Sequence, residues 1–168
     1  MLEAFGQIAS RAPDANLVFA GPDFGMRTAL VERAHELGLA DRVSFLGYAD
    51  DHLRRNAYLR AEFVVVPSRS EAMSLVALEA GAAGKPVLLT DQCGFDEVGG
   101  FGGHVVPASI EGLARGLGEL LDPSADLARM GQELREFVLE QYAWPKIGQR
   151  LLAHLDALYD RRGALTGL

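Results

Sequence analysis

Cysteine and aromatic residues are scarce in this sequence, and long apolar runs are absent from it. One cysteine, Cys93, stands among 168 residues, and aromatic residues make up 8% of the chain. A single cysteine forms no internal disulfide and no cysteine-based zinc cluster, so we expect a reducing compartment. No apolar run approaches the roughly 20 residues that cross a bilayer, and the first residues lack the pattern of a signal peptide. We therefore expect a cytoplasmic domain without a membrane span.

Positive charge is also in short supply. The chain has 16 Lys and Arg residues against 23 Asp and Glu residues, which gives a formal net charge of −7 at pH 7. That balance argues against a nucleic-acid partner and against an anionic membrane surface. Hydrophobic residues, by contrast, make up 49% of the chain, and this length suits one domain with a core of its own. We expect a single domain over residues 1–168.

Short apolar runs alternate with stretches of helical periodicity, which is typical of an α/β fold with a mostly parallel sheet. The clearest strand is predicted over 62–67, where consecutive apolar residues suit a strand buried on both faces. The other predicted strands cover 16–21, 42–47, 86–90 and 103–107. Helices are predicted over 2–12, 25–37, 50–60 and 74–83 and, with turns near 122–123 and 144–145, from 109 onward. The glycine-rich stretch 94–103 is predicted to be a loop.

Candidate ligand contacts gather where the 62–67 strand ends. In open α/β sheets, ligands bind in the crevice outside the carboxyl ends of the strands. The helix that starts near Ser74 directs free N–H groups and a partial positive charge into that crevice, and Ser74 can cap it. Glu79 lies within this helix, Glu71 approaches from the loop, and Arg69 supplies a positive charge nearby. Taken alone, the two carboxylates are better interpreted as a helix-dipole partner, Glu71, and a solvated surface residue, Glu79.

The sequence segments around these residues resemble those of a known protein family. The segments that carry the resemblance are Val65-Val-Pro-Ser-Arg-Ser-Glu71, Leu75-Val-Ala-Leu-Glu-Ala80, Ala83-Gly-Lys-Pro-Val87, Thr90-Asp91, Gly94 and Glu97-Val98. In order and spacing they resemble the donor-binding segment of the family 4 retaining glycosyltransferases (glycosyltransferase group 1). Earlier and later stretches, such as Val43-x-Phe-Leu-Gly47 and Tyr142-Ala-Trp144, agree with it. The resemblance implies the C-terminal half of a two-domain GT-B enzyme, a Rossmann-like parallel sheet flanked by helices.

The resemblance also implies roles for individual residues. The first Glu of the family's pair contacts hydroxyls of the donor sugar, which makes Glu71 the candidate catalytic residue. The second Glu holds the ribose hydroxyls, which assigns donor binding to Glu79. Further donor contacts are implied for the backbone N–H groups of Met73, Ser74 and Leu75, which meet the sugar and diphosphate, and for Gly47 and Tyr48, which lie against the base.

Two departures from the family pattern stand out. Ala72-Met73-Ser74 occupies the place where the family commonly has Gly-Phe-Gly, and the loss of both glycines restricts how closely the backbone approaches a ligand. The family's basic pair on the diphosphate, an Arg and a Lys, falls upstream of residue 1.

The activity that the resemblance implies is sugar transfer, with retention, from a UDP-, GDP- or ADP-linked donor in glycan or polysaccharide biosynthesis. No metal or other cofactor is expected. A glycan or lipid acceptor would bind the missing N-terminal domain, so the isolated chain is expected to be inactive, and the full-length parent would work in the cytoplasm or at the inner membrane face. Two alternatives stay open: a noncatalytic nucleotide-sugar binding module, which Ala72-Met73-Ser74 favours, and a GT-B nucleotide-sugar epimerase.

The chain opens in a predicted helix instead of a strand, so we expect an N-terminally truncated domain that lacks its first strand. In a Rossmann-like sheet of order 3-2-1-4-5-6, that strand would lie between the strands of Leu17 and Val64. Its loss would expose two hydrogen-bonding edges. Three outcomes stay open: the gap closes, a neighbouring chain fills it through self-association, or the sheet is rearranged.

Other reactive side chains carry weaker signals. The four histidines show no metal-ligand spacing, so no metal site is predicted. Cys93 has no recognisable basic partner and is interpreted as a small packing residue. Glu97 is expected to fix its loop.

Overall fold

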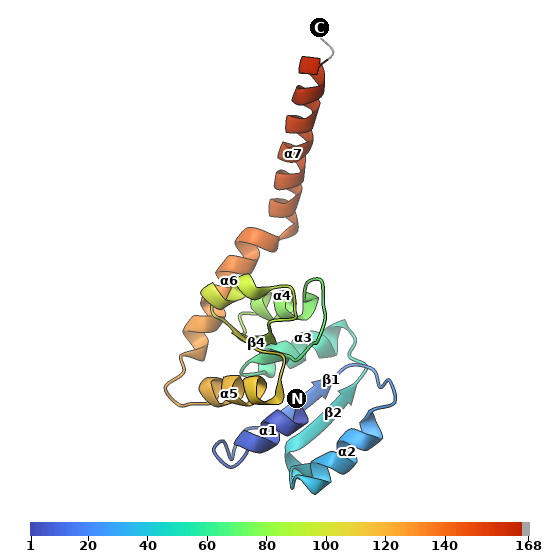
Figure 1. Ribbon diagram of the computed structural model, residues 1–168, viewed down its shortest axis with the longest axis vertical. Helices are drawn as coiled ribbons and strands as arrows, with labels where there is room; N and C mark the ends of the chain where they lie inside the picture. The colour runs from blue at the N-terminus through green and yellow to red at the C-terminus, as the bar shows by residue number, and fades with distance from the viewer. Residues whose placement is uncertain (166–168) are drawn as a thin grey trace.

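The computed structural model describes the backbone of residues 1–165 and the side chains of residues 1–159. Most of the chain folds into an α/β body, and the last helix, α7 (Trp144–Leu165), projects from that body (Figure 1). The strands are β1 (Leu17–Ala20), β2 (Val43–Gly47), β3 (Val64–Val66), β4 (Val87–Thr90) and β5 (Gly103–Val106). The other helices are α1 (Leu2–Ile8), α2 (Arg27–Glu36), α3 (Asp51–Arg60), α4 (Leu75–Ala82), α5 (Ile110–Leu120) and α6 (Leu127–Tyr142).

The predicted alternation of strands and helices is confirmed, with differences at the ends of elements. Helix α2 starts at Arg27 instead of residue 25 because the Asp23 carboxylate accepts the N–H groups of Gly25, Met26 and Arg27 at 2.8, 3.0 and 3.1 Å. Two short 3₁₀ helices were not predicted, η1 (Ala40–Arg42) and η2 (Asp96–Gly100). The second of these lies inside the stretch that the sequence predicts as a loop.

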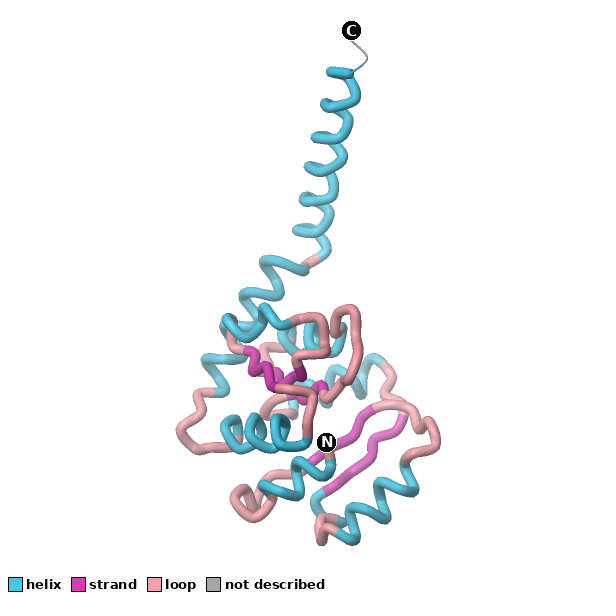
Figure 2. Tube along the Cα trace, in the orientation of Figure 1, coloured by secondary structure: helices cyan, strands magenta, loops and turns pink. Residues whose placement is uncertain are grey.

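The strands form two separate parallel groups, as Figure 2 shows. Strand β1 pairs with β2, and β4 pairs with β3 on one side and β5 on the other. Within the described part of the chain, no strand pairing joins β1 to β3. Strands β1 and β3 therefore each keep an unpaired edge, as expected for a sheet that lacks a strand between those of Leu17 and Val64.

A shared hydrophobic cluster joins the two sheets in place of hydrogen bonds. Helix α1 buries Phe5 and Ile8 in this cluster, and it packs against α5 (Figure 1). Strands of both sheets contribute to the cluster, which includes Leu17, Phe19, Val43, Val65, Leu88 and Val106. A second cluster lies where α4 and α6 cover the other sheet face, around the fully buried Leu89 and Leu134. Neighbouring residues of β4 thus point to opposite faces, as the pleat of a strand requires.

Arg42 adds a polar connection between α1 and the β1–β2 sheet. Its guanidinium donates hydrogen bonds to the carbonyls of Ala9 and Ala15, both at 2.9 Å, and to that of Ala12. It also lies over the Phe5 ring, 5.1 Å from the centroid. These carbonyls belong to the turn after α1, where no helix continues to satisfy them. Arg42, which directly precedes β2, therefore fixes the path of the chain from α1 into β1.

At the opposite end of the body, the hydroxyl of Tyr142 donates to the carboxylate of Glu97, which ties η2 to α6. The Tyr142 ring also meets Phe95 edge-on at 5.3 Å between centroids. Glu97 thus fixes its loop, as the sequence indicates. Burial, and then the hydrogen bond to Glu97, raise the pKa of Tyr142 from 10.0 to about 12.

Helix α7 leaves the body with several apolar side chains exposed. They are Trp144, Leu151, Leu152, Leu155, Leu158 and Tyr159. None of the helices in the described residues, α7 included, combines the length and the apolar character that a membrane crossing needs.

We predict that replacing Arg42 loosens α1 from the β1–β2 sheet. Arg42→Ala removes charged donors from several carbonyls and should lower the free energy of unfolding by about 2 kcal/mol. Urea unfolding followed by circular dichroism measures this change. Arg129→Ala, which removes an exposed α6 arginine paired with Asp126 and Glu133, is the control and should shift it by less than about 0.5 kcal/mol. Equal effects of the two variants would contradict a special role for Arg42.

A second prediction concerns alkaline pH. Because the pKa of Tyr142 is higher in the folded than in the unfolded chain, the folded state binds more protons between pH 10 and about 12. Its contribution to the free energy of unfolding is therefore complete below pH 10 and is lost as pH rises through that window. Tyr142→Phe should show a shallower decline of the melting temperature from pH 9.5 to 11.5. An unchanged slope of melting temperature against pH in Tyr142→Phe would contradict this role of the Tyr142–Glu97 hydrogen bond.

Candidate functional site

The candidate site begins where β3 ends and the chain turns into α4. Ser74 is the N-cap of α4, as predicted: its buried hydroxyl accepts the N–H of Ala77 at 3.3 Å. Because helical N–H groups in the first turn have no carbonyl partner within the helix, this end of α4 presents donors outward. The local sequence explains the start of the helix, since serine is among the preferred N-cap residues.

A row of backbone donors lies at this helix start. Within residues 1–165, the N–H groups of Met73, Ser74, Leu75 and Val76 have no hydrogen-bond partner. Consecutive free donors and the positive end of the helix dipole together favour an anionic ligand such as a phosphate. Three of these residues, Met73 to Leu75, are ones that the family resemblance assigns to the sugar and diphosphate.

The loop that precedes these donors is held by the loop after β4. The N–H of Glu71 donates to the Gln92 carbonyl at 2.9 Å, and the Thr90 hydroxyl donates to the Ser68 carbonyl. Gly94 has a φ of +60°, and a Cβ added there would collide with the carbonyl oxygen of Ala72. Only glycine allows this close approach. The β4 loop therefore sets the path of the backbone through Glu71 and Ala72.

Cys93 lies beneath the same loops and is fully buried. Its Sγ is 3.3 Å from the Thr90 hydroxyl and 3.4 Å from the Val66 carbonyl. Both neighbours belong to the strands whose ends form the site. The interpretation of Cys93 as a small packing residue fits this position.

Glu71 stands at the surface of the loop. Its carboxylate accepts a hydrogen bond from the hydroxyl of Ser68, three residues earlier. Arg69, between them in sequence, is exposed and has no salt-bridge partner among residues 1–159. The loop thus offers an exposed carboxylate and an exposed guanidinium beside the row of donors.

Glu79, in the second turn of α4, has partners that the sequence does not predict. The hydroxyl of Tyr58 donates to its Oε2 at 2.9 Å, and Nε of Arg54 lies 3.2 Å from the same oxygen. Both residues belong to α3, which lies beside α4 (Figure 1). Burial, and then the bond to Glu79, raise the pKa of Tyr58 above its usual 10.0, so its hydroxyl stays a protonated donor at neutral pH.

Gly47 and Tyr48 lie in the other sheet, at the end of β2. Gly47 has a φ of +68°, and its carbonyl accepts the N–H of Gly21 at 2.9 Å. The Tyr48 side chain is 77% exposed. Glu71, Glu79 and the α4 donors therefore lie on one loop and the helix that follows it. Gly47 and Tyr48 lie at the end of a strand of the other sheet, and α3 connects them to β3 along the chain.

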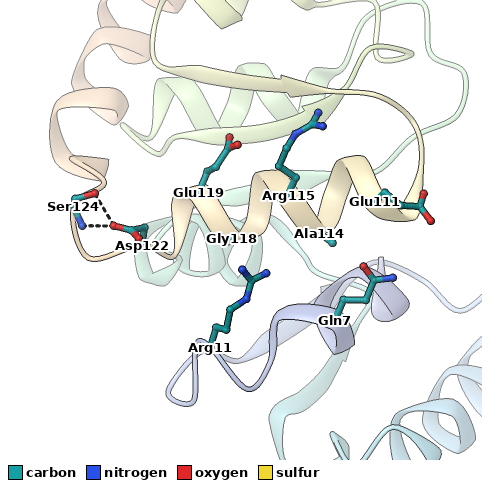
Figure 3. A pocket seen from close by; sticks show the side chains of 9 residues that line it. All are labelled: Gln7, Arg11, Glu111, Ala114, Arg115, Gly118, Glu119, Asp122 and Ser124. Atoms are coloured by element: carbon teal, nitrogen blue, oxygen red, sulfur yellow. Dashed lines mark hydrogen bonds between the residues drawn. The ribbon is translucent and has the colours of Figure 1, made fainter.

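A separate surface groove of about 620 Å³ lies between α1 and α5 (Figure 3). Gln7 and Arg11 lie below α5 in this view, and the side chains of Arg115 and Glu119 extend upward from α5 (Figure 3). The residues that line this groove include none of the site residues that the sequence predicts. The candidate site remains at the carboxyl end of β3, with Glu71 in the loop that follows this strand and Glu79 on the helix after that loop.

Comparisons with known proteins agree with this arrangement. The family model described as "Glycosyl transferases group 1" matches residues 1–137. A D-inositol 3-phosphate glycosyltransferase from Gordonia bronchialis is 37% identical over 141 residues, which are 80% of this chain and 31% of that protein. The chain thus spans about a third of the length of this curated relative.

Solved structures share the fold. The C-terminal domain of the group 1 glycosyltransferase LpcC from Francisella tularensis matches with a TM-score of 0.73 and 26% identity, over 84% of this chain and 76% of that one. Anabaena HepE, solved in complex with UDP, matches with a TM-score of 0.80 over 93% of this chain and 44% of that one, and its 22% identity supports the fold alone. The chain belongs to the glycosyl transferases group 1 family, and its α/β architecture is that of the C-terminal domain of a GT-B glycosyltransferase.

Proposed function

We propose that this chain is the donor-binding part of a retaining glycosyltransferase that moves a sugar from a nucleoside diphosphate to an acceptor. The observation that carries the proposal is the row of free N–H groups from Met73 to Val76, flanked by the carboxylates of Glu71 and Glu79. Amide donors suit a diphosphate, and carboxylates suit the hydroxyls of a sugar and a ribose. The UDP bound by the structural neighbour HepE is a ligand of this class.

In the proposed mechanism the site acts on the leaving group. The α4 amides stabilise the negative charge that grows on the diphosphate as the glycosidic bond breaks, and Arg69 adds positive charge beside it. Glu71 orients the sugar through its hydroxyls, Glu79 anchors the ribose, and Gly47 and Tyr48 border the base. Attack by the acceptor on the face that the diphosphate leaves, assisted by that phosphate, accounts for retention without an enzymic nucleophile.

The acceptor is assigned to a part of the enzyme outside this chain. The short span of the chain within its Gordonia relative and its likeness to the C-terminal domain of LpcC support that division. We propose a glycan or lipid acceptor, no requirement for a metal, and action in the cytoplasm or at the inner membrane face. A noncatalytic nucleotide-sugar binding module is the second candidate, because Ala72-Met73-Ser74 replaces the family's glycines.

The first test is calorimetric titration of UDP, GDP and ADP into the chain. One nucleotide should bind, and Glu79→Gln should weaken it at least about tenfold, because a charged hydrogen-bond acceptor for the ribose is lost. Glu133→Gln, a neutralisation on the exposed side of α6, is the matched control. A folded Glu79→Gln variant that binds as tightly as the unmodified chain would contradict the proposal. Sugar transfer by the full-length parent, lost on Glu71→Ala, would exclude the noncatalytic module.

A second test uses the loop contact at Gly94. Gly94→Ala forces the new Cβ against the Ala72 carbonyl and strains a left-handed backbone, so the loop of Glu71 must shift. We expect nucleotide affinity to fall by about tenfold or more, since misplaced donors lose their ligand contacts. Gly100→Ala, where a Cβ meets open space, should bind normally. Equal affinity in both variants would show that the β4 loop does not support the site.

A further inference from the structure

Glu79 is held by two donors from a different helix. Tyr58 and Arg54 occupy positions one turn apart on α3, and both contact Oε2 of Glu79, at 2.9 and 3.2 Å. No hydrogen bond within residues 1–159 engages the other carboxylate oxygen, Oε1. The Glu79 side chain is 41% exposed. One oxygen is therefore fixed by the protein, and the second is free to accept from a ligand.

The two donors are themselves anchored. A second nitrogen of Arg54 pairs with Asp51 at 3.1 Å, and Asp50 caps α3 by accepting the N–H of Leu53 at 2.8 Å. The Tyr58 ring packs against the buried cluster under α4 and α6. A free glutamate on a helix surface loses rotamer freedom when it binds a ligand. Here that entropy is already lost in the folded protein, so the carboxylate is preorganised.

We propose that Arg54 and Tyr58 are positioning residues that fix the carboxylate of Glu79 for the ribose hydroxyls, and that they thereby set the preference of the site for ribonucleotides over 2′-deoxyribonucleotides. The inference rests on the proposed function, because it assumes that Glu79 binds the ribose of the nucleotide. Arg54 and Tyr58 act through Glu79 and have no assigned contact with the ligand.

Their place in the chain adds a second consequence. Helix α3 starts at Asp51, three residues after Tyr48, the residue assigned to the base. The segment that presents the base contact therefore also presents the donors for Glu79. Tyr48 thus lies just before the start of α3, and the two donors to Glu79 lie within that helix.

The competing explanation is that Tyr58 and Arg54 merely fasten α3 to α4. Loss of a purely structural tie would weaken the binding of every nucleotide to the same extent. Loss of a positioning contact would reduce only the part of the affinity that comes from the ribose hydroxyls, so the 2′-deoxy form, which lacks one of them, would be weakened less than the ribonucleotide. The ratio of the dissociation constants for the 2′-deoxy and ribo forms separates these explanations.

The experiment measures that ratio by calorimetry. The probes are the tightest-binding member of UDP, GDP and ADP and its 2′-deoxy form, titrated into the full chain and into Tyr58→Phe and Arg54→Gln. We expect each variant to bind the ribonucleotide about three- to tenfold more weakly, as for a lost hydrogen bond, and to bind the 2′-deoxy form with a smaller loss, so that the ratio of the two dissociation constants falls. Tyr159→Phe and Arg129→Gln, exposed residues far along the chain, are the controls and should keep the original ratio.

A double-mutant cycle completes the design. In a Glu79→Gln background, Tyr58→Phe should cause no further loss of discrimination, because the contact it supports is already gone. If Glu79→Gln lowers the ratio while Tyr58→Phe and Arg54→Gln leave it unchanged or weaken both ligands equally, the positioning role is wrong and the proposed function stands. If no nucleotide binds, or Glu79→Gln has no effect, the proposed function falls together with this inference. Thermal unfolding of each variant verifies that it is folded.

Discussion

The packing of α1 against both sheets is the contact on which the rest of the fold depends. Strands β1 and β3 share no pairing in the described chain, so the backbone ladder that unites most parallel sheets is interrupted. Phe5 and Ile8 of α1 belong to a hydrophobic cluster to which strands of both sheets contribute. Arg42 adds hydrogen-bond donors to the carbonyls of the turn that follows α1. Hydrophobic contact is less directional than a strand ladder. The relative placement of the two sheets therefore follows from side-chain packing and from the short connection through α3.

The division of the strands into two sheets also divides the candidate site. The residues assigned to the base, Gly47 and Tyr48, end a strand of one sheet, whereas Glu71 and the α4 amides end a strand of the other. Within the second sheet the geometry is tightly determined, because the β4 loop fixes the β3 loop by hydrogen bonds and by the close approach at Gly94. The contacts of Arg54 and Tyr58 with Glu79 join α3, which follows the first sheet along the chain, to α4 of the second.

Local signals in the sequence predict much of this. Ser74 is a serine directly before an apolar helix, so its role as N-cap follows from residue type and position, and the strand at Val64–Val66 follows from its β-branched run. The prediction of unpaired edges beside Leu17 and Val64 rests instead on the strand order of a Rossmann-like sheet, which the family resemblance implies. By contrast, η2 lies in a glycine-rich stretch, where no periodicity marks a 3₁₀ turn. The roles in ligand binding stay predictions for all of the assigned residues, which are Glu71, Glu79, Met73, Ser74, Leu75, Gly47, Tyr48 and Arg69.

The partners of Glu79 could not be predicted, and the reason is physical. Tyr58 and Glu79 are 21 residues apart, on helices separated by a strand, and neither residue type nor spacing encodes which helix faces meet. In the sequence of α3, Tyr58 and Arg54 are typical of an ordinary amphipathic helix, since Tyr58 has an apolar ring and Arg54 an exposed charge. Only the packing of α3 against α4 turns them into a pair of donors for one carboxylate oxygen. A carboxylate held in this way is oriented before a ligand arrives, so the affinity it contributes depends on a helix that the ligand itself does not need to touch.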